Sequence, residues 1–472
     1  MNPARPAEAV THGGGTVAPS RDDGVVRAAS EVAGGPAGSH VGVGRHGRWT
    51  ATPLLVLAVT ATTGLAVLAR QHCRTTLWAS PDQFTHACYS DLPAVYLTSG
   101  LDAGAVPYLD PVGGAFLAAP VGTGGLLWML SQLVPGDLVA GEAALWLFDL
   151  GVLLIALAAV ATVLAVVGLS GRRPWDGALV ALSPVLVTGS LVSVDLVAVA
   201  LAALGVWSFA RRRPALAGVL LGLAATVRPI TGLVLLALFL LGVRTGRRRP
   251  VRVALLAAAV VVLAANLPVL IASPEGWWAY PASLLEAPVG YGSLWLLPQL
   301  AGYPVPASVA RWVAAVLALL VVVAVALFVL GVRRRPRFAV VVLLLVVGVL
   351  VVGVAIPVQT TLLVLPFAAL ALPRWKDLLV WGALEAAYAT GTWFYLYAQS
   401  EPSRGLPPWA YAMLLTARVA ALCWLAWRAV EVSRDPALDP VRSPSEDPHG
   451  ARDDPAAGEL EDAPDALVVR FS

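Results

Sequence analysis

The chain has 472 residues, of which 58% are hydrophobic and 13% are charged, and its mean hydropathy is +0.77. This composition excludes a soluble globular protein and predicts an all-α polytopic membrane protein. The formal net charge is only +3, and the basic residues form short clusters between apolar runs. Such clusters orient membrane spans and do not indicate a nucleic-acid partner.

The two ends of the chain are polar. Residues 1–50 are rich in Gly, Ala, Pro and Arg, and residues 431–472 are acidic and interrupted by proline. Neither stretch has the hydrophobic periodicity of a packed helix, so both are predicted to be disordered cytoplasmic tails. They flank a predicted transmembrane domain over residues 51–430.

Arginine clusters fix the expected orientation of this domain. The clusters near 172–173, 211–213, 244–252, 333–337 and 374–376 should face the cytoplasm. About twelve spans then connect the two tails. They are expected near residues 53–70, 142–168, 177–190, 194–209, 253–272, 308–331, 338–356, 360–373, 377–397 and 408–428, with two short helices within 214–243 that meet at Arg228-Pro229.

Residues 71–134 form the largest predicted outer loop. The positions of the arginine clusters require that one of the hydrophobic stretches 113–134 and 142–168 does not cross the membrane. The first of these contains Pro120 and several glycines, so we expect it to be a juxtamembrane or re-entrant helix on the outer surface. Cys73 and Cys88 in this loop either form a disulfide, if the loop lies outside the cytoplasm, or remain free thiols.

Asp91 is the candidate catalytic residue of the outer loop. Near the membrane boundary, partial desolvation raises the proton affinity of a carboxylate and suits it to act as a general base. The alternative is a solvated loop aspartate. Tyr89 and Tyr96, on either side of Asp91, are candidates for orienting a substrate.

Further polar residues converge on the expected outer face. Asp195 is the first residue of an apolar helix. Its carboxylate either caps that helix or contacts the substrate. Arg228 stands at the predicted helix break and either binds a phosphate or snorkels to neutralise a nearby acid. Arg311 is a second candidate for phosphate, and Gln359 is a candidate for substrate contact. Aromatic residues over 277–295 either belong to an interfacial belt or line a sugar or prenyl groove.

Two other pairs of ionisable residues can be interpreted from their positions in the chain. Within the last two spans, Glu385 is expected to be either buried and neutral or paired with Arg418. His72 and His86 in the outer loop lack the spacing of metal ligands on one helix, so neither a metal nor another cofactor is predicted.

A family resemblance follows from several motifs. The chain resembles the family 87 glycosyltransferases, which are polyprenyl-phosphate-sugar-dependent membrane enzymes of the GT-C class. The likeness covers about residues 70–430. Its motifs are CYSDLPAVY, PYLD, APVGTGGLLWML, FDLGVLLIAL, RRPWDGALVALSP, SVDLVAVALAALGVW, LAGVLLGLAATVRP, NLPVLIASPEGWW, YGSLW and LPPWAYAMLLTARVAALCWLAWR.

The resemblance implies a GT-C-like helical bundle in the plasma membrane, with its active site on the outer face. It implies inverting transfer of mannose or another hexose from a polyprenyl-phosphate donor to a glycolipid or cell-envelope glycan. Asp91 matches the position of the family's general base, and Arg228 the position of a basic residue that holds the donor phosphate. Asp195 matches the acid of an Asn-Trp-Asp-like motif.

The chain departs from the family pattern at three places. Ala118-Ala119 replaces an acid and an aromatic residue, Ser193-Val194 replaces Asn-Trp, and 356–360 replaces a Ser-Pro-Gln-Tyr-like stretch. Each departure removes a possible substrate contact. The departures make a non-catalytic partner in envelope assembly one alternative interpretation. A lipid or solute transporter is the other, because an acid-lined membrane cavity would serve it equally well.

Overall fold

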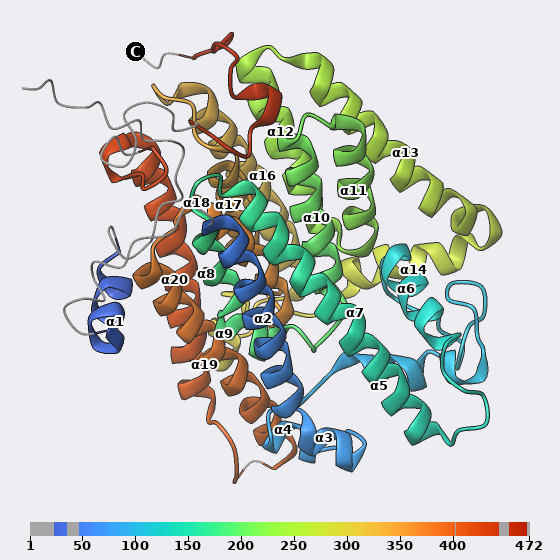
Figure 1. Ribbon diagram of the computed structural model, residues 1–472. Helices are drawn as coiled ribbons and strands as arrows, with labels where there is room; N and C mark the ends of the chain where they lie inside the picture. The colour runs from blue at the N-terminus through green and yellow to red at the C-terminus, as the bar shows by residue number, and fades with distance from the viewer. Residues whose placement is uncertain (1–22, 35–46, 402, 443–452, 470–472) are drawn as a thin grey trace, which may run out of the picture.

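The computed structural model describes residues 23–34, 47–401, 403–442 and 453–469. Secondary structure in these ranges is helical, apart from one isolated antiparallel bridge between Val112 and Ala115. Within these ranges, five helices are long and apolar enough, by length and composition, to cross a membrane. The prediction of an all-α membrane protein is therefore confirmed, and Figure 1 shows the helices gathered into one bundle.

The five long helices are α2 (Gly47–Leu68), α7 (Ala140–Leu169), α13 (Arg248–Ala272), α16 (Ala307–Gly331) and α20 (Pro408–Arg434). A rise of about 1.5 Å per residue lets helices of this length span a hydrocarbon core of about 30 Å. α13 and α16 bury the smallest share of their apolar surface inside the protein. Their exposed apolar side chains therefore suit contact with lipid.

Shorter helices fill the interior. They are α10 (Asp195–Ala210), α11 (Pro214–Val227), α12 (Gly232–Thr245), α17 (Phe338–Val352) and α18 (Val364–Ala371), followed by the longer α19 (Trp375–Ser400). Every residue of α18 and 11 of the 15 residues of α17 are buried. A helix that is apolar on all sides is stable in such a position because neighbouring helices surround it.

Two of the expected spans are broken. Residues 177–190 form α8 (Ala178–Ala181) and α9 (Pro184–Gly189), interrupted at Ser183-Pro184. Residues 360–373 begin in a 3₁₀ turn, η6 (Val358–Leu363), and continue as α18. Proline lacks the N–H that would continue a helix across the first break. The expected count of about twelve spans is therefore not confirmed.

The predicted outer loop folds into short helices at one end of the bundle. These are α3 (Gln71–Thr76), α4 (Asp82–Thr85), α5 (Asp91–Thr98) and α6 (Val121–Ser131). With 11 residues, α6 is too short to span a bilayer, as expected for a helix that does not cross. Cys73 and Cys88 form a disulfide, which decides between the two alternatives for these cysteines.

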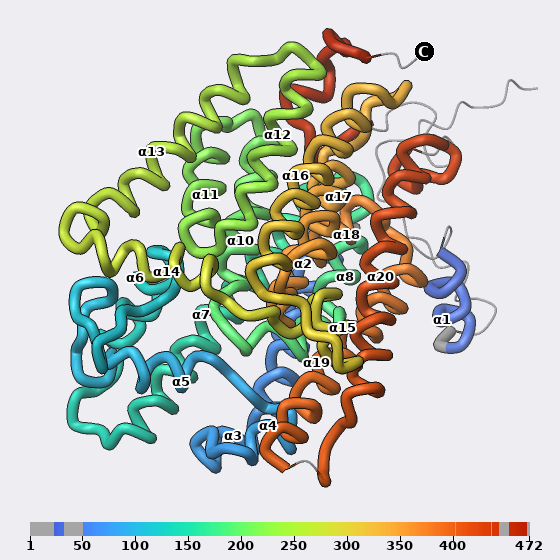
Figure 2. Tube along the Cα trace, turned by 180° about the vertical axis from the view of Figure 1, so that it is seen from behind, coloured from blue at the N-terminus to red at the C-terminus, as the bar shows by residue number. Residues whose placement is uncertain are grey.

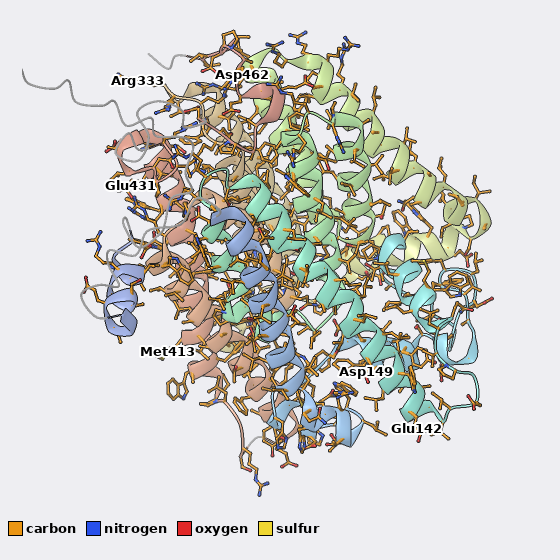
Figure 3. All side chains as sticks on the ribbon, viewed as in Figure 1. Glu142, Asp149, Arg333, Met413, Glu431 and Asp462 are labelled. Carbon is orange, nitrogen blue, oxygen red and sulfur yellow. A yellow bond between two sulfur atoms is a disulfide. The ribbon has the colours of Figure 1, made fainter. Side chains whose placement is uncertain are left out.

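The opposite end of the bundle holds the C-terminal segment, as Figures 1 and 2 show. Arg337 forms a bidentate pair with Asp439, with N–O distances of 2.9 Å, and Asp465 lies 2.7 Å from the buried Arg244. The labelled Arg333 and Asp462 lie at this end in Figure 3. The described parts of 431–472 thus differ from the expected disordered tail, because their acids pair with arginines at helix ends.

The N-terminal region is described only in part. Residues Gly24–Gly34 form α1, and α2 begins at Gly47. The expectation of a disordered tail over residues 1–50 otherwise falls on residues 1–22 and 35–46, which lie outside the described ranges.

Candidate active site

Asp91 is the first residue of α5, and backbone contacts hold it against the segment that precedes α10. Ser90 caps α5, and its Oγ donates to the Leu191 carbonyl at 2.8 Å. The Asp91 N–H donates to the Val192 carbonyl at 2.7 Å. Because Val192 lies three residues before Asp195, these bonds bring two carboxylates from separate elements into one site.

The surroundings of Asp91 make it a stronger base than an ordinary aspartate. Burial and the nearby Asp195 carboxylate raise the pKa of Asp91, while a hydrogen bond from Tyr89 and the charge of Arg228 oppose the rise. The net result is a pKa of about 6. Such a carboxylate is ionised at neutral pH and still accepts a proton readily, as a general base must.

An aromatic cluster fixes Tyr89, whose hydroxyl donates to Asp91. The Tyr89 ring lies 4.9 Å from the ring of Trp393 on α19 and 5.8 Å from that of Phe84 on α4, measured between centroids. Packing on both rings restricts the Tyr89 side chain. The Tyr89 side chain that donates to Asp91 is therefore held by rings from two helices, α4 and α19.

Arg228 stands at the break between α11 and α12, as the sequence predicts. Its backbone is extended there, and its Nε lies 3.0 Å from Asp195 Oδ2. Its Nη2 donates to Thr360 Oγ1 at 3.0 Å. Among the described residues these contacts engage Nε and Nη2, so Nη1 remains for an anionic ligand. Asp195 is the first residue of α10, and its carboxylate faces the Arg228 guanidinium.

The 3₁₀ turn η6 contacts both halves of the site. Gln359 Nε2 lies 3.5 Å from Asp91 Oδ2, a long hydrogen bond, and the next residue, Thr360, accepts from Arg228. η6 therefore connects the candidate base with the candidate phosphate-binding arginine.

A buried ion pair holds η6 in place. Arg418 Nε lies 2.9 Å from Glu385 Oε2, and both side chains are almost completely buried. Arg418 also donates to the Ile356 carbonyl at 2.6 Å, and Glu385 accepts from Thr361 at 3.2 Å. The pairing of Glu385 with Arg418, one of the two expected alternatives, is thus found.

Two predicted site residues are not brought to this cluster. Arg311, on α16, donates to the Ala287 carbonyl. Tyr96 is 4% exposed and packs in the hydrophobic core of the bundle. In the part of the chain that the structure describes, no contact joins either side chain to Asp91.

The site also contains three residues that were not among the predicted catalytic, phosphate-binding or substrate-orienting residues. Tyr280, on α14 (Pro274–Glu286), lies close enough to Arg228 and Asp195 for their charges to act on its pKa, which burial raises. The only sequence signal for Tyr280 was its place in the aromatic stretch 277–295. Thr360 belongs to the stretch 356–360 that departs from the family pattern, whereas Trp393 had no signal. The roles of both residues depend on contacts with residues far away in the chain.

A second cluster of polar side chains lies beside the site, on α3 and α4. The ligand atoms of His72, Asp82 and His86 all lie within 4.8 Å of one another. Spacing along one helix does not reveal this group, because its members come from two short helices that the Cys73–Cys88 disulfide ties together. This set of donors could hold a metal ion.

The chain was compared with known proteins. The family model of glycosyltransferase family 87 matches residues 108–366, more than half of the chain. Asp195, Arg228, Arg311 and Gln359 lie within the matched range, whereas Asp91 precedes it. No curated protein matches the chain.

Proposed function

The chain belongs to glycosyltransferase family 87, and we propose that it transfers a sugar from a polyprenyl-phosphate donor to a glycolipid or cell-envelope glycan. The observation that carries this proposal is the placement of Asp91, with a pKa of about 6, beside the Arg228–Asp195 ion pair. One group of the site suits removal of a proton, and the other suits binding of a phosphate.

In the proposed reaction, Asp91 accepts the proton of the acceptor hydroxyl as its oxygen attacks the anomeric carbon of the donor. The bond between that carbon and the phosphate oxygen breaks, and polyprenyl phosphate leaves with the bonding electrons. Attack opposite to the leaving group inverts the configuration. Arg228 stabilises the charge that develops on the phosphate, as preorganised donors do in other transfer reactions.

The other predicted residues receive different roles. Asp195 orients Arg228 and can accept a hydrogen bond from a sugar hydroxyl, and Gln359 orients Asp91. The hydrogen bond from Tyr89 stabilises the ionised carboxylate of Asp91. Arg311 remains a second candidate for the donor phosphate, and we assign Tyr96 to packing of α5, because it lies in the core.

We place the protein in the plasma membrane as a GT-C-class bundle, with the site on the outer face and membrane lipids around it. The Cys73–Cys88 disulfide supports this orientation, since disulfides persist in oxidising compartments. The arginine clusters at the other end of the bundle support cytoplasmic termini. A total of about twelve crossings then requires that the broken segments α8–α9 and η6–α18 each count as one.

The test is a transfer assay with the purified protein in lipid. Radiolabelled polyprenyl-phosphomannose and a membrane glycolipid extract are supplied to the wild type and to Asp91→Asn. We expect label to move into a new glycolipid or glycan with the wild type only. Equal transfer by both proteins contradicts the role of Asp91. A parallel series of polyprenyl-phosphate donors carrying other hexoses or pentoses identifies the sugar.

A non-catalytic role in envelope assembly is the second candidate, and the departure Ala118-Ala119 favours it. These residues directly precede α6, where family members carry an acid and an aromatic residue. Envelope glycans that are altered by deletion of the gene and restored equally by wild type and by Asp91→Asn would support this role. Solute or lipid uptake by proteoliposomes, without transfer, would instead indicate a transporter.

A further inference from the structure

We propose that His72, Asp82 and His86 form a binding site for a divalent transition-metal ion such as Zn²⁺. His72 Nε2 lies 2.5 Å from Asp82 Oδ2, and His86 Nδ1 lies 3.2 Å from Asp82 Oδ1. The two imidazole rings stack with their centroids 3.5 Å apart. Two imidazoles and one carboxylate thus face a common point.

The chemistry of this donor set selects the ion. Imidazole nitrogen and carboxylate oxygen are ordinary zinc ligands, whereas Mg²⁺ and Ca²⁺ prefer oxygen donors alone. The three side chains are 35–46% exposed. A metal ion can therefore enter from solvent, and water can complete a tetrahedral shell.

The site needs only small side-chain movements to accept zinc. Two ligands of a tetrahedral Zn²⁺ ion lie about 3.3 Å apart, given metal–ligand distances near 2.0 Å. The ligand atoms here already lie within 4.8 Å of one another, so rotation of exposed side chains is sufficient. His86 Nδ1 also lies 2.8 Å from Thr85 Oγ1, and this contact gives way if Nδ1 is the ligand atom.

The fold prepares the site before a metal arrives. His72 is adjacent to Cys73 in α3, and His86 lies two residues before Cys88, so the disulfide restrains both histidines. Asp82 and His86 are four residues apart, at the two ends of α4. Closing a loop beforehand removes much of the entropy cost that assembling separate ligands would require.

Bound metal would fasten α3 to α4 beside the candidate active site. α4 also carries Phe84, which stacks on Tyr89, the residue that donates to Asp91. The metal site would thus stabilise the support of Asp91 without contacting the reacting atoms. The proposal is independent of the transfer reaction, since metal binding is measured directly.

The test uses the full chain in detergent with no affinity-tag histidines. The chain has six histidines, and four of them, His12, His40, His46 and His449, lie outside the described residues. These four are replaced by Asn to give the background protein. Zn²⁺ binding is measured by competition with a fluorescent chelator, and Co²⁺ binding by visible absorption.

We expect the background protein to bind one equivalent of Zn²⁺. His72→Asn, His86→Asn and Asp82→Asn should each weaken binding by at least about tenfold, because each removes a ligand. Asp137→Asn, at an exposed acid between α6 and α7, is the control and should bind as tightly as the background. Co²⁺ should give the intense absorption of a tetrahedral site only when all three ligands are present.

Two results would overturn the proposal. One is the absence of saturable Zn²⁺ binding by the background protein, and the other is equal affinity in the His72→Asn/His86→Asn double variant. A rise in melting temperature with Zn²⁺ in the background, lost in the double variant, is the second readout. Size-exclusion elution and thiol titration of the metal-free variants establish that fold and disulfide are intact.

Discussion

Arg228 Nε lies 3.0 Å from Asp195 Oδ2, so the guanidinium at the break between α11 and α12 faces the carboxylate that opens α10. The Asp195 side chain is 8% exposed and that of Arg228 is 28% exposed. Such a contact can be an ion pair that only stabilises the bundle, or it can hold Arg228 ready for a phosphate. The two roles make different predictions.

Neutralising both Arg228 and Asp195 should distinguish a structural ion pair from a phosphate-binding arginine. Arg228→Gln and Asp195→Asn should each lower the melting temperature, because each leaves one charge largely buried without its partner. The double variant should recover stability, with a coupling free energy of about 1–3 kcal/mol. Its transfer rate should nevertheless remain at least about 10²-fold below wild type, because the Arg228 guanidinium that would bind the phosphate of the substrate is missing. Recovery of both stability and rate would leave Arg228 with a structural role alone.

Asp91→Asn should abolish the base while keeping the fold. The backbone bond to Val192 and the Ser90 cap do not involve the Asp91 side chain. We expect the initial rate of transfer to fall by about 10²–10⁴-fold, the usual contribution of a general base. Asp102→Asn, at an exposed acid eleven residues further along the same segment, should transfer at the wild-type rate. A comparable loss in both variants would argue against a specific role for Asp91.

The pH profile should report the ionisation of Asp91. A base acts only when deprotonated, so kcat/KM should rise with pH through a midpoint of about 6 and then level off. The hydrogen bond from Tyr89 lowers the pKa of Asp91, so Tyr89→Phe should move this midpoint to higher pH. The exposed Tyr303→Phe serves as control and should leave the midpoint unchanged. A downward shift in Tyr89→Phe would contradict the assigned hydrogen bond.

Removal of Arg418 should destabilise the protein and loosen η6. Arg418→Met leaves the buried Glu385 without its ion-pair partner, which costs about 3–5 kcal/mol of unfolding free energy. The melting temperature in detergent should fall accordingly. Glu385→Gln/Arg418→Met should recover only part of the loss, because the Ile356 carbonyl still lacks its donor. Full recovery would show that η6 does not depend on Arg418.

Local chemistry explains which features the sequence predicted. The break at Arg228-Pro229 follows from the missing N–H of proline, and the length of α6 follows from its glycines and flanking proline. Assigning arginine clusters to one side of the membrane placed Asp91, Asp195, Arg228 and Gln359 on a common face. The structure brings these four residues together although they are up to 268 positions apart.

The remaining features depend on tertiary geometry. Arg311 and Tyr96 were expected at the site. The Arg311 side chain instead donates to a backbone carbonyl, and the Tyr96 side chain packs in the core. Trp393 contacts Tyr89 only because α19 packs beside α4. The choice between a disulfide and free thiols also required the distance between Cys73 and Cys88, whose Cα atoms lie 5.8 Å apart.

The acids of the C-terminal segment have a consequence for biosynthesis. Arg244 and Arg337 are translated long before Asp465 and Asp439, the residues that pair with them in the finished protein. During insertion by the translocon these arginines therefore carry unneutralised charge, when positive charge directs the orientation of nascent helices. The acids reach them only after the last helix has emerged from the ribosome. In the proposed orientation, the same side chains would serve first as topology signals and afterwards as docking points for the end of the chain.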